Sequence, residues 1–337
     1  MRAMASGAEV VCTTVGPYAK YGMTLAEACA REGTHYADLT GEVLFVRSSI
    51  DRYHAAAEAS GARIVHSCGY DSIPSDLGVL MVYEAARAAG AGPLTDALLV
   101  AKGKGGVSGG TIDSLRTQVD AVRADPTRQQ IIDDPYALSP DRAGEADMGP
   151  QSDNFRPRRD PMAGEWIGPF VMGAFNTRIV RRSNALQAWA YGRSLRYQEA
   201  MAGGPAPFGP ILATGMGVAL RASAPAMSFS PTRAVLDRFL PKPGGGPSEA
   251  TQRRGYFRSD IYAGTNEGAR YHGVIAGDGD PGYSATAVML GESALCLALD
   301  RAQLPDRSGV LTPATAMGHV LTGRLRKAGF RCEVGTT

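Results

Sequence analysis

The chain has 337 residues, of which 44% are hydrophobic and 20% are charged, and its formal net charge is +2. This length suits two domains of ordinary size, and the near-neutral charge gives no sign of a nucleic-acid partner. Its five cysteines and five histidines are scattered, which disfavours a disulfide framework or a metal site and indicates reduced thiols in a cytoplasmic chain.

The first 90 residues alternate between short β-branched apolar runs and helical patterns that end at glycine. The expected order is strand 9–15, helix 21–31, strand 34–39, helix 43–60, strand 62–68 and helix 77–89. Such short units imply parallel strands with right-handed crossovers. The predicted fold class is therefore α/β, with an incomplete doubly wound parallel (Rossmann-like) sheet in this part of the chain.

The usual opening of a dinucleotide-binding sheet is absent from the start of this sequence. Such sheets begin with a strand and a G-x-G-x-x-G turn, and no turn of this kind occurs near residue 1. We therefore expect the first βαβ unit to be missing, through a downstream start, a shortened gene or trimming. The other interpretation is a different cofactor-binding mode, or none.

Beyond residue 90 the pattern becomes mixed, and a polar, proline-rich loop is expected at 133–165. The expected strands lie at 94–101, 170–180, 195–200, 256–262, 269–275 and 330–334, and the expected helices at 112–124, 184–191, 286–299 and 313–327. This predicts a remnant Rossmann domain at 1–92, a second mixed α/β domain at 93–304, suited to substrate binding or dimerisation, and a C-terminal helix and strand at 305–337 that pack back on the first domain.

One apolar run stands out, from Ile211 to Leu220, and Arg221 ends it. About 20 apolar residues are needed to cross a bilayer, so this run does not predict a transmembrane helix. The favoured interpretation is a core helix or a packed loop. The alternative is a segment that rests on a membrane surface, since Arg233 and Arg238 follow it.

Polar and glycine-rich loops follow three of the predicted strands. In doubly wound sheets, ligands bind beyond the carboxyl ends of the strands. The candidate residues of these loops are Val15, Gly16, Pro17, Tyr18, Gly41, Gly69, Tyr70 and Asp71. Simpler interpretations are that the first loop is a plain strand-ending turn, and that acidic residues at 69–76 cap the next helix.

Two further segments are candidates for substrate contact. The glycine-dense segment 102–111 could cradle a phosphate or phosphopantetheine group, with Lys104, Ser108 and Thr111 as contacts; the alternative is a flexible hairpin. Arg178 belongs to a cluster of four arginines that could dock an acidic carrier protein or a phospholipid surface. The alternative for that cluster is a solvated charged face.

Several segments, in order and at characteristic spacing, resemble one family from about residue 8 to the C-terminus. They include TTVGPYAKYGMTLAEAC, HYADLTGE, ARIVHSCGYDSIPSDLGV, KGGVSGGTIDS, NTRIVRRSNAL and DGDPGYSAT. Together they resemble the trans-acting enoyl reductases of actinobacterial lipid synthesis, within the saccharopine-dehydrogenase-like oxidoreductases.

The resemblance implies an NADP- (or NAD-) dependent enoyl reductase of cell-envelope lipid synthesis, of the phthiocerol or glycolipid type. It also implies a glycine-rich pyrophosphate-binding turn, which this chain lacks. The implied partner is an acyl thioester or a polyketide-synthase carrier domain, and a homodimer and peripheral contact with the plasma membrane are further options.

The resemblance also suggests roles for the loop residues. Val15, Gly16, Pro17, Gly41 and Gly69 would line the cofactor site. The proton donor or enolate stabiliser would be Tyr70, Asp71 or Tyr18.

Two other functions remain as alternatives. One is a non-catalytic, Rossmann-derived module that binds lipid or carrier protein, which the missing turn favours. The other is a saccharopine-type amino-acid dehydrogenase. It is disfavoured because Leu77 stands where the amino-acid-reducing relatives of this family carry histidine.

Overall fold

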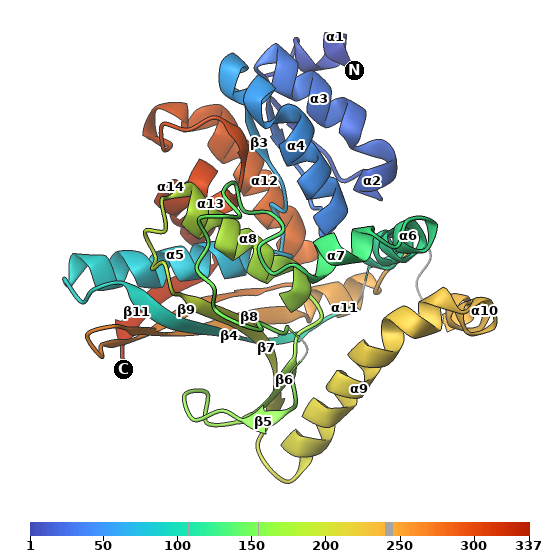
Figure 1. Ribbon diagram of the computed structural model, residues 1–337, viewed down its shortest axis with the longest axis vertical. Coiled ribbons are helices and arrows are strands. Elements are labelled where there is room, and N and C mark those ends of the chain that lie inside the picture. The colour runs from blue at the N-terminus through green and yellow to red at the C-terminus, as the bar shows by residue number, and fades with distance from the viewer. Residues whose placement is uncertain (107, 154, 240–244) are drawn as a thin grey trace.

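The computed structural model describes residues 1–106, 108–153, 155–239 and 245–337 (Figure 1). It contains a four-stranded sheet, in the order β1-β2-β3-β10, and a seven-stranded sheet, in the order β11-β9-β8-β4-β7-β6-β5. Helices pack on both sheets. The predicted α/β fold class, with a Rossmann-like parallel sheet and a second mixed sheet, is confirmed.

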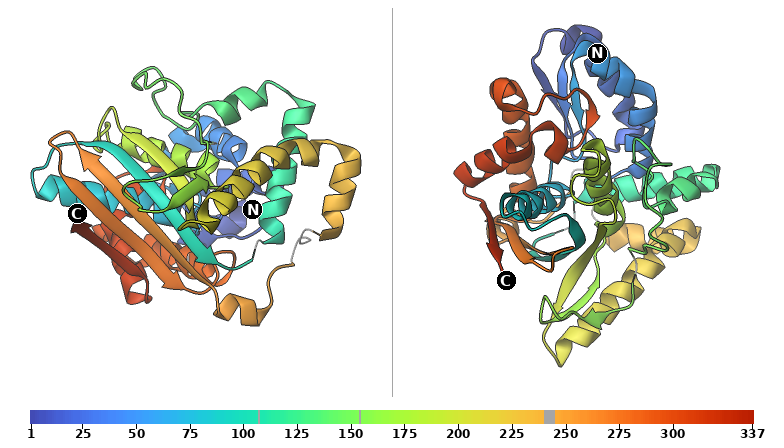
Figure 2. Two further views of the ribbon diagram at one scale, coloured as in Figure 1. Left: turned by 90° about the horizontal axis from the view of Figure 1, so that it is seen from below. Right: turned by 60° about the vertical axis from the view of Figure 1, so that its left-hand side comes forward.

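All strands of the first sheet are parallel. β1 (Val10–Cys12), β2 (His35–Ala37) and β3 (Arg63–Val65) follow the predicted order, and β10 (Gly309–Leu311) joins them beside β3. The connecting helices are α2 (Tyr18–Tyr21), α3 (Met23–Glu32) and α4 (Val43–Ser60). Figures 1 and 2 show these helices on one side of the strands and α12 (Ser284–Leu299) on the other, so both faces of the sheet are covered.

The second sheet is built around β4 (Leu94–Lys104), which pairs parallel with β7 (Arg196–Gly204) and antiparallel with β8 (Tyr256–Thr265). β9 (Arg270–Asp278) and β11 (Arg331–Thr336) extend one side of this sheet, and β6 (Trp166–Pro169) and β5 (Arg158–Arg159) extend the other. The last part of the chain thus serves both sheets, through β10 in the first and β11 in the second. The domain boundaries at 92–93 and 304–305 stay predictions.

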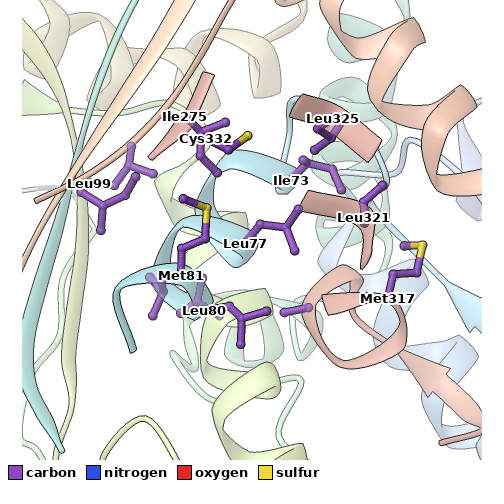
Figure 3. Close-up of a cluster of buried hydrophobic side chains, with 14 of the residues drawn as sticks. Ile73, Leu77, Leu80, Met81, Leu99, Ile275, Met317, Leu321, Leu325 and Cys332 are labelled. Carbon is purple, nitrogen blue, oxygen red and sulfur yellow. The ribbon is translucent and has the colours of Figure 1, made fainter. Parts of the chain in front are cut away.

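Helix α5 (Ile73–Ala88) forms the centre of the largest core. Side chains around its whole first half are buried, as expected for a helix enclosed on all sides. It packs against β8, β9 and α8 (Gly173–Leu186), and also against α13 (Pro313–Ala316) and α14 (Gly318–Lys327). Figure 3 shows Ile73, Leu77 and Met81 of α5 among side chains from the second sheet and from α14.

Three predicted elements differ in the structure. The strand expected at 170–180 is largely the start of α8, and the helix expected at 184–191 ends at Leu186. The β-branched run in this segment favoured a strand, but burial of nearly the whole of α8 overrides local propensity. The helix expected at 313–327 breaks at Met317, because Gly318 adopts a left-handed conformation with φ 51°.

The segment 211–220 lies in α9 (Phe208–Ser228), which leads into α10 (Ser230–Phe239). Small residues at Gly209, Ala213 and Gly217 face the body of the protein, whereas Ile211 and Leu212 are exposed. The favoured interpretation of a core helix or packed loop therefore holds for the buried face of α9 and is wrong for the exposed face. None of the described helices combines the length and apolar character needed to cross a membrane.

Gly69 provides a test of the packing where the two halves of the chain meet. A methyl group there would clash with Thr286 Oγ1 and Leu39 Cδ2, and Thr286 would have to release the backbone N–H of Tyr70. We expect Gly69→Ala to lower the free energy of unfolding by about 1–3 kcal/mol, measured by urea denaturation.

The matched control is Gly291→Ala in the interior of α12, where an added methyl group meets no atom within 4 Å. This variant should gain about 0.5–1 kcal/mol, because alanine favours a helix over glycine. Equal stability of the two variants would contradict the packing described here.

Candidate functional site

The loops after β1, β2 and β3 meet at one edge of the first sheet. The Tyr18 hydroxyl donates to the Thr13 carbonyl oxygen (3.2 Å) and accepts from the Leu39 N–H (3.1 Å), which joins the first two loops. The Ser67 hydroxyl donates to the Thr40 carbonyl oxygen (2.7 Å), which joins the second and third. The loops 16–18, 40–42 and 69–76 thus form one structural unit at the carboxyl ends of the strands.

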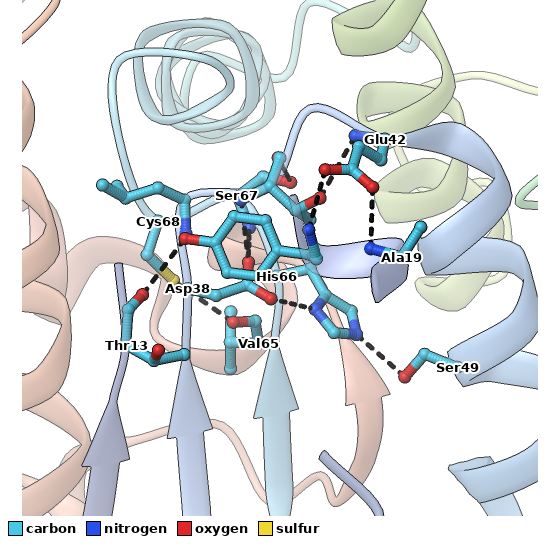
Figure 4. A network of polar contacts seen from close by, with 12 residues as sticks. Thr13, Ala19, Asp38, Glu42, Ser49, Val65, His66, Ser67 and Cys68 are labelled. Atoms are coloured by element: carbon cyan, nitrogen blue, oxygen red, sulfur yellow. Dashed lines mark hydrogen bonds and ion pairs between the residues drawn. The ribbon is translucent and has the colours of Figure 1, made fainter. Parts of the chain in front are cut away.

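A buried carboxylate, Asp38, organises two of these loops (Figure 4). Its Oδ1 accepts from the backbone N–H groups of Thr40 and Ser67, both at 3.0 Å, and its Oδ2 lies 2.7 Å from His66 Nδ1. His66 Nε2 in turn lies 2.9 Å from Ser49 Oγ on α4. Solvent does not reach this Asp–His–Ser chain, so it serves to hold the loops in place rather than as a nucleophile.

A second carboxylate, Glu42, closes the N-terminus of α2. It accepts hydrogen bonds from the Tyr18 N–H (2.9 Å), the Ala19 N–H (2.8 Å) and the Ser114 hydroxyl (2.6 Å). Helix N-termini attract anions, and here the protein's own carboxylate takes that place. Gly41 was among the predicted site residues, whereas Glu42, which is adjacent to it in the same polar loop, was not.

The residues expected to line a cofactor site differ in their accessibility. Val15, in the loop after β1, is 61% exposed, and a side chain added at Gly16 would lie beside Tyr18, whose ring is 3.4 Å away. Gly41 lies near the end of the Met172 side chain. Two side chains pack closely against Gly69. Packing in the core therefore explains the glycine at this position without a bound cofactor.

Tyr70 and Asp71 lie where the third loop approaches the second sheet. The Tyr70 N–H donates to Thr286 Oγ1 (2.9 Å), and the Tyr70 ring meets Phe257 edge-on, with centroids 5.4 Å apart. Removal from water raises the pKa of Asp71 to about 7, and the nearby Asp38 carboxylate adds to this shift. Burial also raises the pKa of the Tyr70 phenol, so the phenol keeps its proton at neutral pH.

The second sheet contributes a carboxyl group, Glu199, to the same region. The Tyr197 hydroxyl donates to Glu199 Oε1 (2.7 Å), and the Asn176 amide donates to Oε2 (2.9 Å). The Ser72 hydroxyl donates to Asn176 Oδ1 (3.1 Å), which connects this group to the third loop. Burial raises the pKa of Glu199 to about 7. No sequence motif marks Glu199, because it reaches the loop only through the pairing of β7 with β4.

Asp76 does not cap the helix that carries it. It accepts hydrogen bonds from the Ala314 N–H (2.7 Å) and from the Ser183 hydroxyl, and it thereby joins α5 to α13 and α8. α5 begins at Ile73 and has no side-chain cap. The interpretation that Asp76 caps its own helix is therefore wrong, because the carboxyl group serves a neighbouring helix instead.

The glycine-dense segment packs against a turn from the C-terminal half. A side chain at Gly105 would lie 2.8 Å from Asp280, and Ser108 caps α6 (Gly109–Ala124) by accepting from the Thr111 N–H at 3.1 Å. Lys104 is exposed at the end of β4. Ser108 and Thr111 are thus bonded to each other in the structure, and Val107 lies outside the described residues.

Asp280 also fills a helix N-terminus. Gly277, Gly279 and Gly282 have G-x-G-x-x-G spacing between β9 and α12. The Asp280 carboxylate accepts from the backbone N–H groups of Gly282 (3.2 Å) and Ser284 (3.1 Å). The anion position of this turn is therefore taken by a protein side chain.

The arginines of α8 are internal. Arg178 is bonded to Asp153 and to the Ile132 carbonyl oxygen (2.9 Å). Arg182 donates to the carbonyl oxygens of Leu138 and Val310. Arg178, Arg181 and Arg182 are all buried, so neither an exposed docking surface nor a solvated charged face exists at these three positions. Of the cluster, only Arg193 is exposed, where it lies over the Trp189 ring.

A cavity of about 210 Å³ opens beside Glu42 at the same edge of the first sheet. Phe45 and Met23 provide apolar surface, and Thr117 of α6 provides a hydroxyl with no partner among the described residues. Arg128 also lines the cavity and is paired with Asp125. The cavity can therefore take a group with both apolar and polar parts.

Asp76 offers a test of the buried carboxyl groups. Burial raises its pKa to about 7, well above the value of about 3.9 for an unfolded chain. A raised pKa means that the folded state binds the proton more tightly than the unfolded chain does. The protonated carboxyl group therefore stabilises the folded state fully below about pH 4, and this stabilisation is lost as the pH rises through 7. We expect the thermal midpoint to fall between pH 5 and pH 7.5.

The unfolding free energy should also fall between pH 5 and pH 7.5. In Asp76→Asn the fall in free energy should be smaller by at least about 1 kcal/mol, since one pKa unit corresponds to about 1.4 kcal/mol. The exposed Asp278→Asn should keep the pH dependence of the natural chain. A full pH dependence in Asp76→Asn would show that this carboxyl group is not the source.

No family model matches the chain. A Mycobacterium tuberculosis protein provisionally named as a trans-acting enoyl reductase is 52% identical over 341 residues, which covers 99% of this chain and 81% of that protein. The trans-acting enoyl reductases of Mycobacterium bovis and Mycobacterium ulcerans are each 47% identical, over 100% and 97% of this chain and 82% and 80% of their own lengths.

Among solved structures, apo saccharopine dehydrogenase (L-Glu forming) of Saccharomyces cerevisiae covers 100% of this chain and 86% of its own, with a TM-score of 0.50 and 12% identity. At that identity the likeness shows the fold alone. The level and extent of identity to the mycobacterial proteins show that this chain belongs to the trans-acting enoyl reductase family.

Proposed function

We propose that this protein is an enoyl reductase that uses a nicotinamide cofactor, NADP (or NAD), to reduce an acyl thioester in lipid synthesis. The observation that carries the proposal is the position of Tyr70 and Asp71 at the edge where three parallel strands end, in a loop to which Glu199 is connected through Asn176 and Ser72. The lipid type, phthiocerol or glycolipid, is proposed from the family resemblance alone.

The residues present fit one half of a dinucleotide better than the other. The exposed backbone at Val15 and Gly16 suits the ribose and nicotinamide, because it follows a parallel strand at its carboxyl end. The pyrophosphate needs a free helix N-terminus, and those of α2 and α12 are filled by Glu42 and Asp280. Val15, Gly16 and Pro17 are therefore the residues that would hold the nicotinamide end.

Reduction of a C=C bond conjugated to a thioester needs a hydride at the β-carbon and a proton at the α-carbon. A reduced nicotinamide supplies the hydride when bound. The protein must supply the proton, and we assign this to Asp71, which is partly protonated at neutral pH. The Tyr70 hydroxyl would donate to the thioester oxygen, where negative charge develops. The Tyr18 hydroxyl is already bonded to two backbone groups, so we do not assign the proton transfer to it.

The cavity beside Glu42 supports a substrate carried on a long arm. Its mixed lining suits the amide and phosphate groups of a pantetheine arm, whether on a small thioester or on a carrier domain. Leu77 is fully buried in the core, so its side chain does not reach the site. The leucine at this position is therefore only weak evidence against an amino-acid substrate.

The proton donor is tested with Asp71→Asn. NADPH oxidation with an enoyl thioester should slow by about a hundredfold, because positioned proton donors contribute on that order. The remaining activity should lose the decline above pH 7 that deprotonation of Asp71 produces in the natural chain. Asp306→Asn, at the opposite edge of the first sheet, should leave both the rate and the pH profile unchanged.

A second candidate is a non-catalytic module that binds lipid or a carrier protein. The filled N-termini of α2 and α12 favour it, because they leave no pyrophosphate position at those two helices. Calorimetric titration of the 337-residue chain with NADPH separates the two. Micromolar binding is expected for the reductase, and an absence of binding, together with retained binding of an acyl carrier protein, would favour the module.

A further inference from the structure

An arm made of α9 and α10 carries the largest group of exposed apolar side chains in the described part of the chain. Figures 1 and 2 show this arm at the periphery, beside β5 and β6. The exposed large side chains on it are Phe208, Ile211, Leu212, Val218, Phe229 and Val235.

The exposed side chains of α9 form one continuous stripe. Phe208, Ile211, Leu212 and Val218 recur at the three- and four-residue spacing of one helix face, with Gly215 between them. Ile211 is 71% exposed, Leu212 is 55% exposed and Val218 is 59% exposed. Isolated apolar residues on a surface are normal, but a contiguous apolar stripe marks a site of interaction.

The opposite face of α9 fixes the orientation of this stripe. Gly209, Ala213 and Gly217 are small and buried, and they bring the helix into close contact with β6 and β7. A side chain at Gly168 of β6 would lie 2.8 Å from the Ala213 carbonyl oxygen. One face of α9 thus packs against the sheet, and the apolar face is exposed to solvent in a fixed orientation.

The exposed charged residues of α9 and of β5 beside it are arginines. Residues 205–236 contain no Asp or Glu, and Arg221 is exposed on the flank of α9. Arg238 is exposed on α10, and Arg156 and Arg159 are exposed beside Pro157, which lies against Gly217. An apolar stripe with a cationic border is complementary to a surface whose headgroups are anionic and whose interior is apolar.

We propose that the stripe on α9 docks on an anionic phospholipid bilayer, with the apolar side chains among the acyl chains and the arginines at the headgroups. A second copy of this chain is the less suitable occupant. The acidic residue of the arm, Asp237, lies near the end of α10, and Asp120 is already paired with Arg233, so self-association through α9 would bring its arginine borders together with no acidic residue of α9 to meet them. The proposal does not depend on the reductase activity.

The test is flotation of the 337-residue chain with vesicles. Vesicles of phosphatidylcholine with phosphatidylglycerol should carry the protein, and pure phosphatidylcholine vesicles should carry much less. Raising the salt concentration should weaken binding to the anionic vesicles, because the headgroup attraction is screened. Ile211→Asp/Leu212→Asp should lower the partition coefficient by about tenfold or more.

The matched control is Leu299→Asp at the end of α12, where the side chain is 69% exposed but lies away from the arm. This variant should bind anionic vesicles as the natural chain does, and both variants should keep its thermal midpoint. Three outcomes would overturn the proposal: equal loss in the control, no preference for anionic lipid, or a stable dimer that dissociates in the Ile211/Leu212 variant while vesicles carry no protein.

Discussion

The structure depends on the burial of α5 on every side. The helix leaves the carboxyl edge of the first sheet and then crosses the second sheet, so its apolar surface fixes how the two sheets lie relative to each other. A buried helix of this kind is stabilised by apolar contact along its length, at roughly 25 cal/mol for each Å² removed from water. Because the third loop leads directly into α5, the position of Tyr70 and Asp71 follows from the packing of the core.

Buried carboxyl groups determine the acid–base properties of the site. Asp38 is satisfied by two backbone N–H groups and by His66, and it holds the second and third loops together. Asp71 and Glu199 lie where water is largely excluded, which shifts their pKa to about 7 and makes proton exchange near neutral pH feasible. The same burial that stabilises the fold thus sets the acidity of the groups at the junction of the sheets.

The sequence predicts much of the fold, because periodicity is a local property. The alternation in the first 90 residues gave the parallel sheet, and the expected helix 43–60 matches α4 residue for residue. The segment 170–180 was mistaken for a strand, since the buried partners that make it a helix lie elsewhere in the chain. The loop residues at the strand ends were predictable from the topology. Glu199 was not, because only strand pairing brings it near Asn176 and the third loop.

Helix α6 touches both regions for which we propose a role. Its Ser114 hydroxyl bonds Glu42 at the first sheet, and its Asp120 carboxylate pairs with Arg233 of α10 at 2.6 Å. Fewer than two turns of helix separate these contacts. The arm and the loop that begins with Gly16 are therefore connected through one rigid helix, so a displacement of α10 that breaks the Asp120–Arg233 pair also removes a support of the helix that holds Ser114 against Glu42.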